Sequence, residues 1–156
     1  MLIGCLVALG GCAQSGSLLT AALGEQRASA TDESGPTEPT PQEVQQALTF
    51  WAAKFSANPG DETTALTFAN NLRHAGKDKQ AVAVLTRAAM ANPSSRKIAG
   101  LHGRLALKLG DVKSARRLLN RAYDPNDPDW RVLSARGVAE AQSGEAGTAV
   151  ATLMKA

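Results

Sequence analysis

The sequence is poor in the residues from which reactive sites are built. Aromatic residues make up 4% of it, and its 156 residues include two cysteines and two histidines. Neither His74 nor His102 has a second metal ligand at helical spacing. Gly76 and Lys77 lack the other residues of a phosphate-binding loop, and Ser134 lacks the context of a nucleophile elbow. We therefore expect no catalytic residue, cofactor, metal or small-molecule substrate.

The sequence also lacks an apolar run that could cross a bilayer, which takes about twenty residues of helix. Residues 2–9 are almost all apolar, and the sequence becomes polar soon after Cys12. This pattern predicts an export signal peptide over residues 1–11. The order leucine, glycine, glycine, cysteine at residues 9–12 resembles the lipobox of bacterial lipoproteins. That resemblance implies a membrane-anchored chain that begins, after cleavage, with a lipidated Cys12.

Two features leave another interpretation of the N-terminus open. No Lys or Arg precedes the apolar run, so the positively charged start of a signal peptide is missing. A short apolar N-terminus that ends in cysteine can also be a buried first helix with a free thiol. We reject cleavage at Cys5, because it would leave almost no apolar segment for export. Since only Cys12 would remain after cleavage, no disulfide is implied.

Residues 12–41 are expected to form a disordered linker. They are rich in Ser, Thr, Gly, Ala and Pro and bury too little apolar surface to offset the entropy of ordering.

Charge is unevenly distributed along the chain. Residues 13–45 carry five acidic residues and one Arg, whereas residues 62–123 carry twelve basic and three acidic residues. This basic middle leaves open a nucleic-acid-associated or adaptor role, although stacking aromatic residues are lacking.

The most informative feature is a period. Beyond the linker, several residue types recur at intervals of 34 residues. The recurring residues are Gly76, Gly110 and Gly144; Ala81, Ala115 and Ala149; Leu85, Leu119 and Leu153; and Ala88, Ala122 and Ala156. A repeat of this length indicates a stack of supersecondary units rather than a single irregular core.

This period resembles that of the tetratricopeptide repeat, a helix-turn-helix unit. The resemblance implies an all-α fold, a right-handed α-solenoid, over residues 42–156. It divides this region into a half unit at 42–61 and repeats at 62–95, 96–129 and 130–156. About three units are needed for stability, so the number is just sufficient. The half unit is expected to pack on the next pair through three aromatic residues: Phe50, Trp51 and Phe55.

Each recurring residue type has a physical role in a pair of packed helices. Small residues at Ala69, Gly103 and Gly137 allow the two helices to approach closely, and the recurring leucines fill the space beside them. The recurring glycines lie between the helices, where a left-handed residue can end the first one. Asp78 and Asp111 are expected to cap the second helices.

A narrower resemblance rests on three sequence segments: residues 128–137, residues 50–59 and residues 80–85. These segments are similar to TadD-type proteins of Flp (tight adherence) pilus assembly, which are lipoproteins with the same order of leader, spacer and repeats. The resemblance implies a non-catalytic scaffold that assists assembly of the pilus and its secretin, without binding nucleic acid. Ala13 favours the outer membrane, facing the periplasm. The alternative is a general tetratricopeptide adaptor or chaperone of another envelope or cytosolic complex.

In such arrays the first helix of each pair lines the concave side. The candidate partner-binding residues on it are Asn70, Arg73, His74, Lys97, Arg104, Lys108 and Arg131. We therefore expect a basic groove that prefers acidic partner segments. The carboxylate clamp of some tetratricopeptide domains, a Lys and an Asn one turn apart, is incomplete here. A second basic row, Lys113, Arg117 and Arg121, is interpreted as a solvated helix face.

Overall fold

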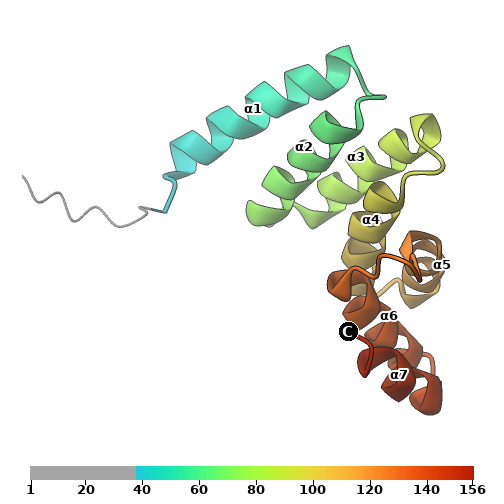
Figure 1. The fold of residues 1–156 in the computed structure, drawn as a ribbon. Helices are drawn as coiled ribbons and strands as arrows, with labels where there is room; N and C mark the ends of the chain where they lie inside the picture. Colours follow the sequence, from blue (N-terminus) through green and yellow to red (C-terminus); the bar gives the residue numbers. More distant parts are fainter. Residues whose placement is uncertain (1–37) are drawn as a thin grey trace, which may run out of the picture. The chain divides into compact units, whose positions relative to one another are not determined.

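The structure is a computed structural model that describes residues 38–156 (Figure 1). This part consists of helices only: α1 (Pro41–Ala57), α2 (Glu62–His74), α3 (Asp78–Ala91), α4 (Arg96–Lys108), α5 (Val112–Ala122), α6 (Trp130–Gln142) and α7 (Ala146–Leu153). The predicted signal peptide, Cys12 and most of the predicted linker lie outside the described residues. Of the seven helices, none combines the length and the apolar character needed to cross a membrane.

Side-chain caps set most of the helix starts. At the start of α1, Thr40 Oγ1 accepts a hydrogen bond from the Glu43 backbone N–H at 3.3 Å, and Glu43 Oε2 accepts one from the Thr40 N–H at 2.7 Å. This capping box satisfies N–H groups that have no partner within the helix. Four other helices have a capping side chain that accepts from a backbone N–H, namely Asp61 for α2, Ser95 for α4, Asp111 for α5 and Asp129 for α6.

The turns inside the helix pairs follow the predicted pattern, with one correction. Gly76, Gly110 and Gly144 have φ values of 72°, 82° and 84°, the left-handed conformation that glycine adopts without strain. The prediction that Asp78 caps α3 is wrong, because the N-cap of α3 is Lys77 and no side chain caps it. The Asp78 carboxylate instead forms an ion pair with Lys108 of α4, as described below.

Contacts between helices define an inner and an outer layer. Between residues 38 and 156, each helix packs on the next, and α2 also contacts α4, as α4 contacts α6. The corresponding contacts between α3 and α5 or between α5 and α7 are absent from this region. The first helices of the pairs therefore lie closer together than the second helices. It follows that α2, α4 and α6 line the inner side of the array.

Close approach within the pairs depends on the small residues identified in the sequence. A Cβ atom added to Gly103 would lie 2.8 Å from Leu119 Cγ, and one added to Gly137 would lie 2.5 Å from Leu153 Cγ. Both distances are shorter than a normal carbon–carbon contact. The expected roles of these glycines and leucines are thus confirmed.

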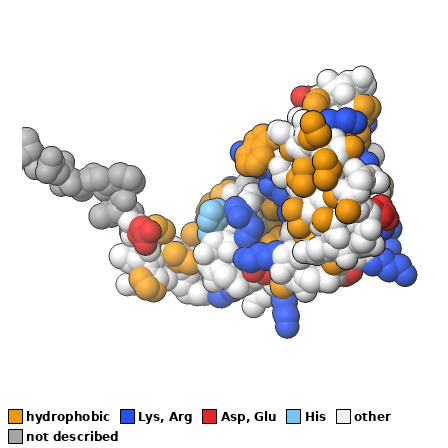
Figure 2. Space-filling view, turned by 90° about the horizontal axis from the view of Figure 1, so that it is seen from below, with side chains coloured by type: hydrophobic (Ala, Val, Ile, Leu, Met, Phe, Trp, Pro, Cys, Tyr) orange, Lys and Arg blue, Asp and Glu red, His pale blue; other side chains and the backbone are white. Residues whose placement is uncertain are grey.

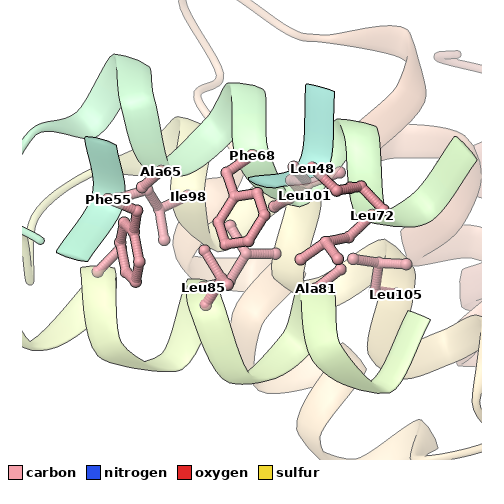
Figure 3. Close-up of a cluster of buried hydrophobic side chains, with 13 residues drawn as sticks. Leu48, Phe55, Ala65, Phe68, Leu72, Ala81, Leu85, Ile98, Leu101 and Leu105 are labelled. Atoms are coloured by element: carbon pink, nitrogen blue, oxygen red, sulfur yellow. The ribbon is translucent and has the colours of Figure 1, made fainter. Parts of the chain in front are cut away.

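A continuous apolar core joins α1 to α4 (Figure 3). Leu85 and Ile98 are fully buried in it, and Phe55 contacts Phe68 with ring centroids 6.0 Å apart. The prediction for the aromatic residues of α1 is correct for Phe55 and for Trp51, which is partly buried against this core, and wrong for Phe50. The side chain of Phe50 is 54% exposed.

Helix α5 is shorter than the other second helices that precede it. It has 11 residues, whereas α3 has 14, and a loop of residues 123–129 follows it. Pro125 disfavours the helical conformation at Asp124 and cannot donate a backbone hydrogen bond, so the last turn is lost. Helix α6 nevertheless begins at Trp130, one period after the start of α4 at Arg96. The loop therefore replaces a helical turn without changing the register of the repeat.

Candidate functional site

The inner helices enclose a hollow of about 510 Å³ between α2, α4 and α6. Four basic side chains line it: Arg73 from the last turn of α2, Arg104 and Lys108 from α4, and Arg131 from the first turn of α6. We call this space the first hollow. All four residues were predicted from the sequence to face the groove, and the structure brings them to one place.

The rest of the first hollow is apolar. Leu101 and Leu105 of α4 are buried and form its floor, whereas Trp130 and Val138 of α6 are 58% and 41% exposed. Figure 2 shows the molecule from the end at which α6 and α7 lie, where apolar side chains gather beside Lys and Arg side chains. A binding surface of this kind combines hydrophobic contact area with a few charged groups that fix orientation.

Arg104 is the most constrained cation of the site. It is half-buried, and its Nε atom is buried without a hydrogen-bond partner among the described residues. Burial lowers the pKa of the Arg104 guanidinium, Asp129 partly offsets this effect, and the nearby charges of Arg131 and Arg73 lower the pKa further. Three positive charges are thus held close together beside a single carboxylate. An anionic ligand would relieve this repulsion.

The cations of the groove differ in how far they are already neutralised. Lys108 Nζ lies 2.7 Å from Asp78 Oδ2, and Lys97 Nζ lies 3.9 Å from Glu62 Oε1. The Arg131 guanidinium lies over the ring of Trp130, 5.1 Å from its centroid, in a cation–π contact that involves no carboxylate. We therefore expect anions to be attracted chiefly by the arginines of the first hollow.

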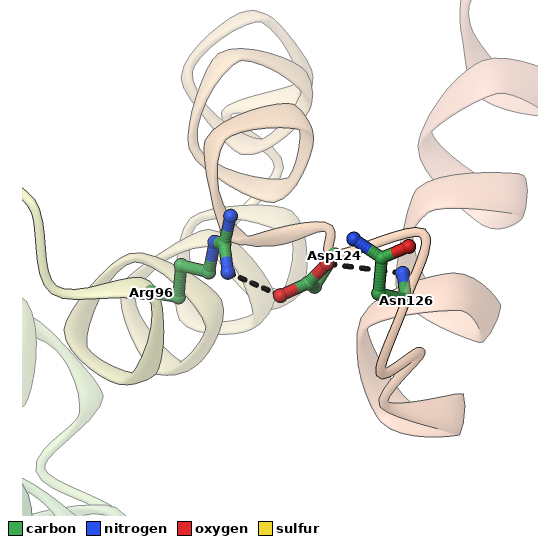
Figure 4. A network of polar contacts seen from close by, with 3 residues as sticks. All are labelled: Arg96, Asp124 and Asn126. Carbon is green, nitrogen blue, oxygen red and sulfur yellow. Dashed lines mark hydrogen bonds and ion pairs between the residues drawn. The ribbon is translucent and has the colours of Figure 1, made fainter.

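A second hollow of about 350 Å³ lies next to the first and shares Leu101 and Arg104 with it. Its lining has mixed charge, with Arg96 and Lys97 on one side and three aspartates of the 123–129 loop on the other. Asp124 pairs with Arg96 and also accepts a hydrogen bond from the backbone of Asn126 at 3.0 Å (Figure 4). These aspartates are already engaged in the structure of the loop or lie beside cations.

Asp124 and Asp129 therefore have structural roles in this loop. Asp129 caps α6, where its Oδ1 accepts from the Arg131 N–H at 2.8 Å. No group of three or more His, Cys, Asp or Glu residues within residues 38–156 is arranged to hold a metal ion.

Not all the predicted residues reach the hollows. Lys97 lines only the second hollow, and Asn70 and His74 line neither. His74 is exposed, and its Nε2 lies 3.1 Å from Nη2 of Arg73. The other histidine, His102, is half-buried, and burial, followed by the charges of Arg121 and Arg117, lowers its pKa. It lies near α5 and lines neither hollow.

Sequence reasoning missed the apolar half of the first hollow. Trp130, the first residue of α6, forms one wall of the hollow. The signal was present, because Ala135 and Val138 follow Arg131 at i+4 and i+7 and therefore share its helix face. Both residues line the first hollow.

No protein-family model matches the chain, and no curated protein matches it in sequence. Solved structures of MamA do match its fold. One has a TM-score of 0.65 and 17% sequence identity, with 71% of this chain and 65% of MamA covered. A second, MamA MSR-1 C2, has a TM-score of 0.60 and 21% identity over 72% of this chain and 64% of its own. The aligned part of this chain thus spans just under two thirds of either structure.

This likeness, together with the arrangement of helices, decides the fold. The described chain is a tetratricopeptide-type α-solenoid. The predicted fold class is confirmed. Folds of this type stack units that contact only their neighbours and present extended inner surfaces to other proteins.

Proposed function

We propose that the protein is a non-catalytic scaffold whose inner surface holds acidic segments of partner proteins. The observation that carries this proposal is the first hollow, where Arg73, Arg104 and Arg131 from three different helices converge. Lysine and arginine side chains supply electrostatic attraction over a long range, whereas the helices keep them in fixed positions. Such a surface suits recognition of a protein segment better than chemical conversion of a substrate.

The proposed setting of this scaffold is the bacterial envelope. The lipobox-like sequence supports a lipid anchor at Cys12, and the similarity to TadD-type proteins supports a role in assembling a Flp pilus and its secretin. Ala13 after that cysteine supports an outer-membrane location, facing the periplasm. The partners would then be components of the pilus or the secretin that carry acidic segments.

The anchor is tested by labelling cells that produce the protein with a radioactive fatty acid, followed by membrane fractionation. We expect label on the native protein and none on Cys12→Ser, which should leave the outer-membrane fraction, because each buried methylene of an acyl chain contributes about 0.8 kcal/mol. Cys5→Ser is the matched control and should retain label. An unlabelled native protein would show that the lipobox interpretation is wrong.

The groove is tested by charge reversal in the full-length protein. Arg104→Glu combined with Arg131→Glu should abolish co-purification of pilus and secretin components, because it replaces two attractive charges by repulsive ones. Lys113→Glu combined with Arg117→Glu makes the same change in net charge on α5, outside the two hollows, and should leave co-purification intact. Equal loss in both variants, or in neither, would argue against the groove as the partner site.

A further inference from the structure

The first hollow combines basic side chains with apolar ones, so it can recognise more in a ligand than negative charge. Its floor, Leu101 and Leu105, is 4% and 1% exposed, so it is already packed, whereas the two walls formed by Trp130 and Val138 are open to solvent. A groove that only attracted acids would not need an exposed indole in its wall. Exposed apolar groups that line a cavity and are rimmed by charge are typical of a place where a partner's side chain inserts.

The three arginines are arranged around this apolar space in a diagonal. Arg73 lies in the last turn of α2, Arg104 in the middle of α4 and Arg131 in the first turn of α6. An arginine can hold a carboxylate through two parallel hydrogen bonds, and the partly exposed side chain of Arg104 lines the hollow. A ligand that crosses the helices along this diagonal meets cations on both sides of the apolar walls.

The spacing of the helices indicates how the ligand's side chains are distributed. The axes of packed helices lie about 8–10 Å apart, and the length of the arginine side chains allows the guanidinium groups of neighbouring helices to lie farther apart than this. In an extended peptide, side chains two residues apart point to the same side, and four residues span about 13 Å. Two acidic residues separated by three others, with an apolar residue midway between them, would therefore place all three side chains on the side facing the hollow.

We propose that the first hollow recognises an extended partner segment of the pattern acidic, any residue, large apolar, any residue, acidic. The apolar side chain enters between Trp130 and Val138, and the two carboxylates bind Arg104 of α4 and Arg131 of α6, the arginines on the two helices that border this space. This inference rests on the proposed scaffold function and specifies what its groove binds. In the second hollow the cations are balanced by the aspartates of the 123–129 loop, so it offers an acidic segment little net attraction and limits the site to α2, α4 and the start of α6.

The probe is a fluorescein-labelled peptide with the core Glu-Ser-Phe-Ser-Glu between neutral flanks. Its binding to the full-length protein in detergent is followed by fluorescence anisotropy at fixed salt. Three control peptides have the same length: one with Ser in place of Phe, one with Gln in place of both Glu, and one with the two Glu placed together at one end. We expect each control to bind at least tenfold more weakly than the probe.

The protein variants separate the two halves of the site. Arg104→Gln and Trp130→Ala should each weaken probe binding at least tenfold, and Arg104→Lys should restore only part of the affinity, because lysine keeps the charge but not the forked geometry. Matched controls are Arg121→Gln, an exposed arginine on α5, and Met90→Ala, a residue on α3 that is 73% exposed. Both controls should bind the probe like the native protein.

Several outcomes would overturn the inference. Equal affinity for the probe and the peptide without Phe would show attraction of charge alone, as would equally strong competition by an oligonucleotide of matched charge. Unchanged binding to Arg104→Gln and Trp130→Ala would place the peptide elsewhere. The scaffold function is tested separately by co-purification. If charge reversal in the groove abolishes partner capture but the probe peptide does not bind, the scaffold function is supported and the peptide pattern is wrong. If the probe binds but charge reversal leaves partner capture unchanged, the scaffold function of the groove is wrong.

Discussion

The first and the last inter-unit contacts of the array occupy the same places in the repeat but differ in chemistry. Phe55 of α1 contacts Phe68 of α2, with ring centroids 6.0 Å apart. Two periods later, the equivalent positions are Tyr123 and Arg136, where the guanidinium lies 4.9 Å from the centroid of the tyrosine ring. A contact between two aromatic rings at the first position thus corresponds to a contact between a cation and an aromatic ring at the last.

Two further equivalent positions show the same change. Leu48 and Leu72 are buried in the core between α1 and α4, and two periods later the residues are Arg116 and Glu140. Glu140 is 4% exposed, its Oε1 lies 3.1 Å from Arg136 Nε, and its Oε2 has no hydrogen-bond partner within residues 38–156. Arg116 Nη2 reaches Glu145 Oε1 at 2.7 Å.

The shape of the array and its stability depend on different residues. The shape is retained because the small residues and leucines that join each helix pair recur in all units. The residues at the contacts between successive units differ from one contact to the next, and at the C-terminal end the carboxylate of Glu140 is buried beside Arg136. A buried ion pair must offset the desolvation of its charges before it contributes anything, so we expect the α6–α7 unit to be the least stable part of the array.

The largest expected effect is in the apolar interface. Phe68→Ala should lower the free energy of unfolding by about 3–5 kcal/mol, because it removes a buried ring and leaves a cavity between α1, α2 and α3. Urea denaturation followed by circular dichroism measures the loss. Phe50→Ala, which truncates an exposed phenylalanine one turn before Phe55, should change stability by less than about 0.5 kcal/mol. Similar losses in the two variants would contradict the comparison.

Converting the polar interface to the apolar type should have the next largest effect. Arg136→Phe combined with Glu140→Leu introduces the residues found at Phe68 and Leu72, and replacing a buried ion pair in this way can stabilise a protein by about 1–4 kcal/mol. Hydrogen exchange in α6 and α7 should slow. Glu140→Leu alone should speed exchange there, because Arg136 then loses its carboxylate. Faster exchange in the double variant would show that the ion pair stabilises this unit.

The two tight glycines offer a finer comparison. Gly103→Ala forces a methyl group against Leu119, which is fully buried, so we expect a cost of about 1–3 kcal/mol that exceeds the gain of about 1 kcal/mol in helix propensity. Gly137→Ala meets Leu153 Cγ at 2.5 Å and the Ala149 carbonyl oxygen at 3.3 Å, but Leu153 is 44% exposed and can shift toward solvent. Thermal unfolding should therefore show a larger loss at Gly103 than at Gly137. The reverse order would mean that the end of the array is packed more rigidly than its middle.

The smallest effect concerns pH. The middle unit has His102 at the position of Phe68 and Arg136, and its pKa in the folded protein is lowered by burial and by Arg121 and Arg117. The unfolded chain therefore takes up this proton first, and folded stability falls as the pH drops below about 6.5. His102→Leu should be less sensitive between pH 7.5 and pH 5, as measured by urea denaturation. His74→Leu is the control at an exposed site and should retain the native pH profile.

The pH window of His102 is separate from that of the helix caps. Hydrogen bonds from Thr64 and Ser114 lower the pKa values of Asp61 and Asp111, so these caps contribute fully above about pH 4 and lose their contribution in more acid solution. A loss of stability confined to the range below pH 4 would assign the effect to the caps instead of to His102.

The sequence predicts those parts of the fold that follow from local spacing. The positive φ of Gly110 and the close contact of Gly103 with Leu119 both follow from a 34-residue period, because each unit repeats the same turn and the same helix pair. The ion pair of Asp78 with Lys108 could not be predicted in this way, since it joins two units and depends on how they are packed.

The candidate site was predictable to a similar degree. Helical position alone placed Arg104 and Arg131 on the inner side, because both lie on the first helix of a pair. The hollow beside Trp130 required the distance between α4 and α6, which depends on side chains of several helices at once. The shortening of α5 is an intermediate case, since Pro125 is visible in the sequence, whereas the continued register of α6 becomes evident only in the structure.

The restriction of contacts to near neighbours has a consequence for the time course of folding. Each helix from α1 to α7 contacts only helices one or two positions away along the chain, so no contact requires the closure of a long loop. Such a low contact order favours rapid folding, and a nucleus can form at any unit and extend in either direction. The chain emerges into its compartment with the N-terminus first, so the apolar α1–α4 region is available before the C-terminal helices. That region can therefore acquire its structure first and serve as a template on which the charged C-terminal helices assemble.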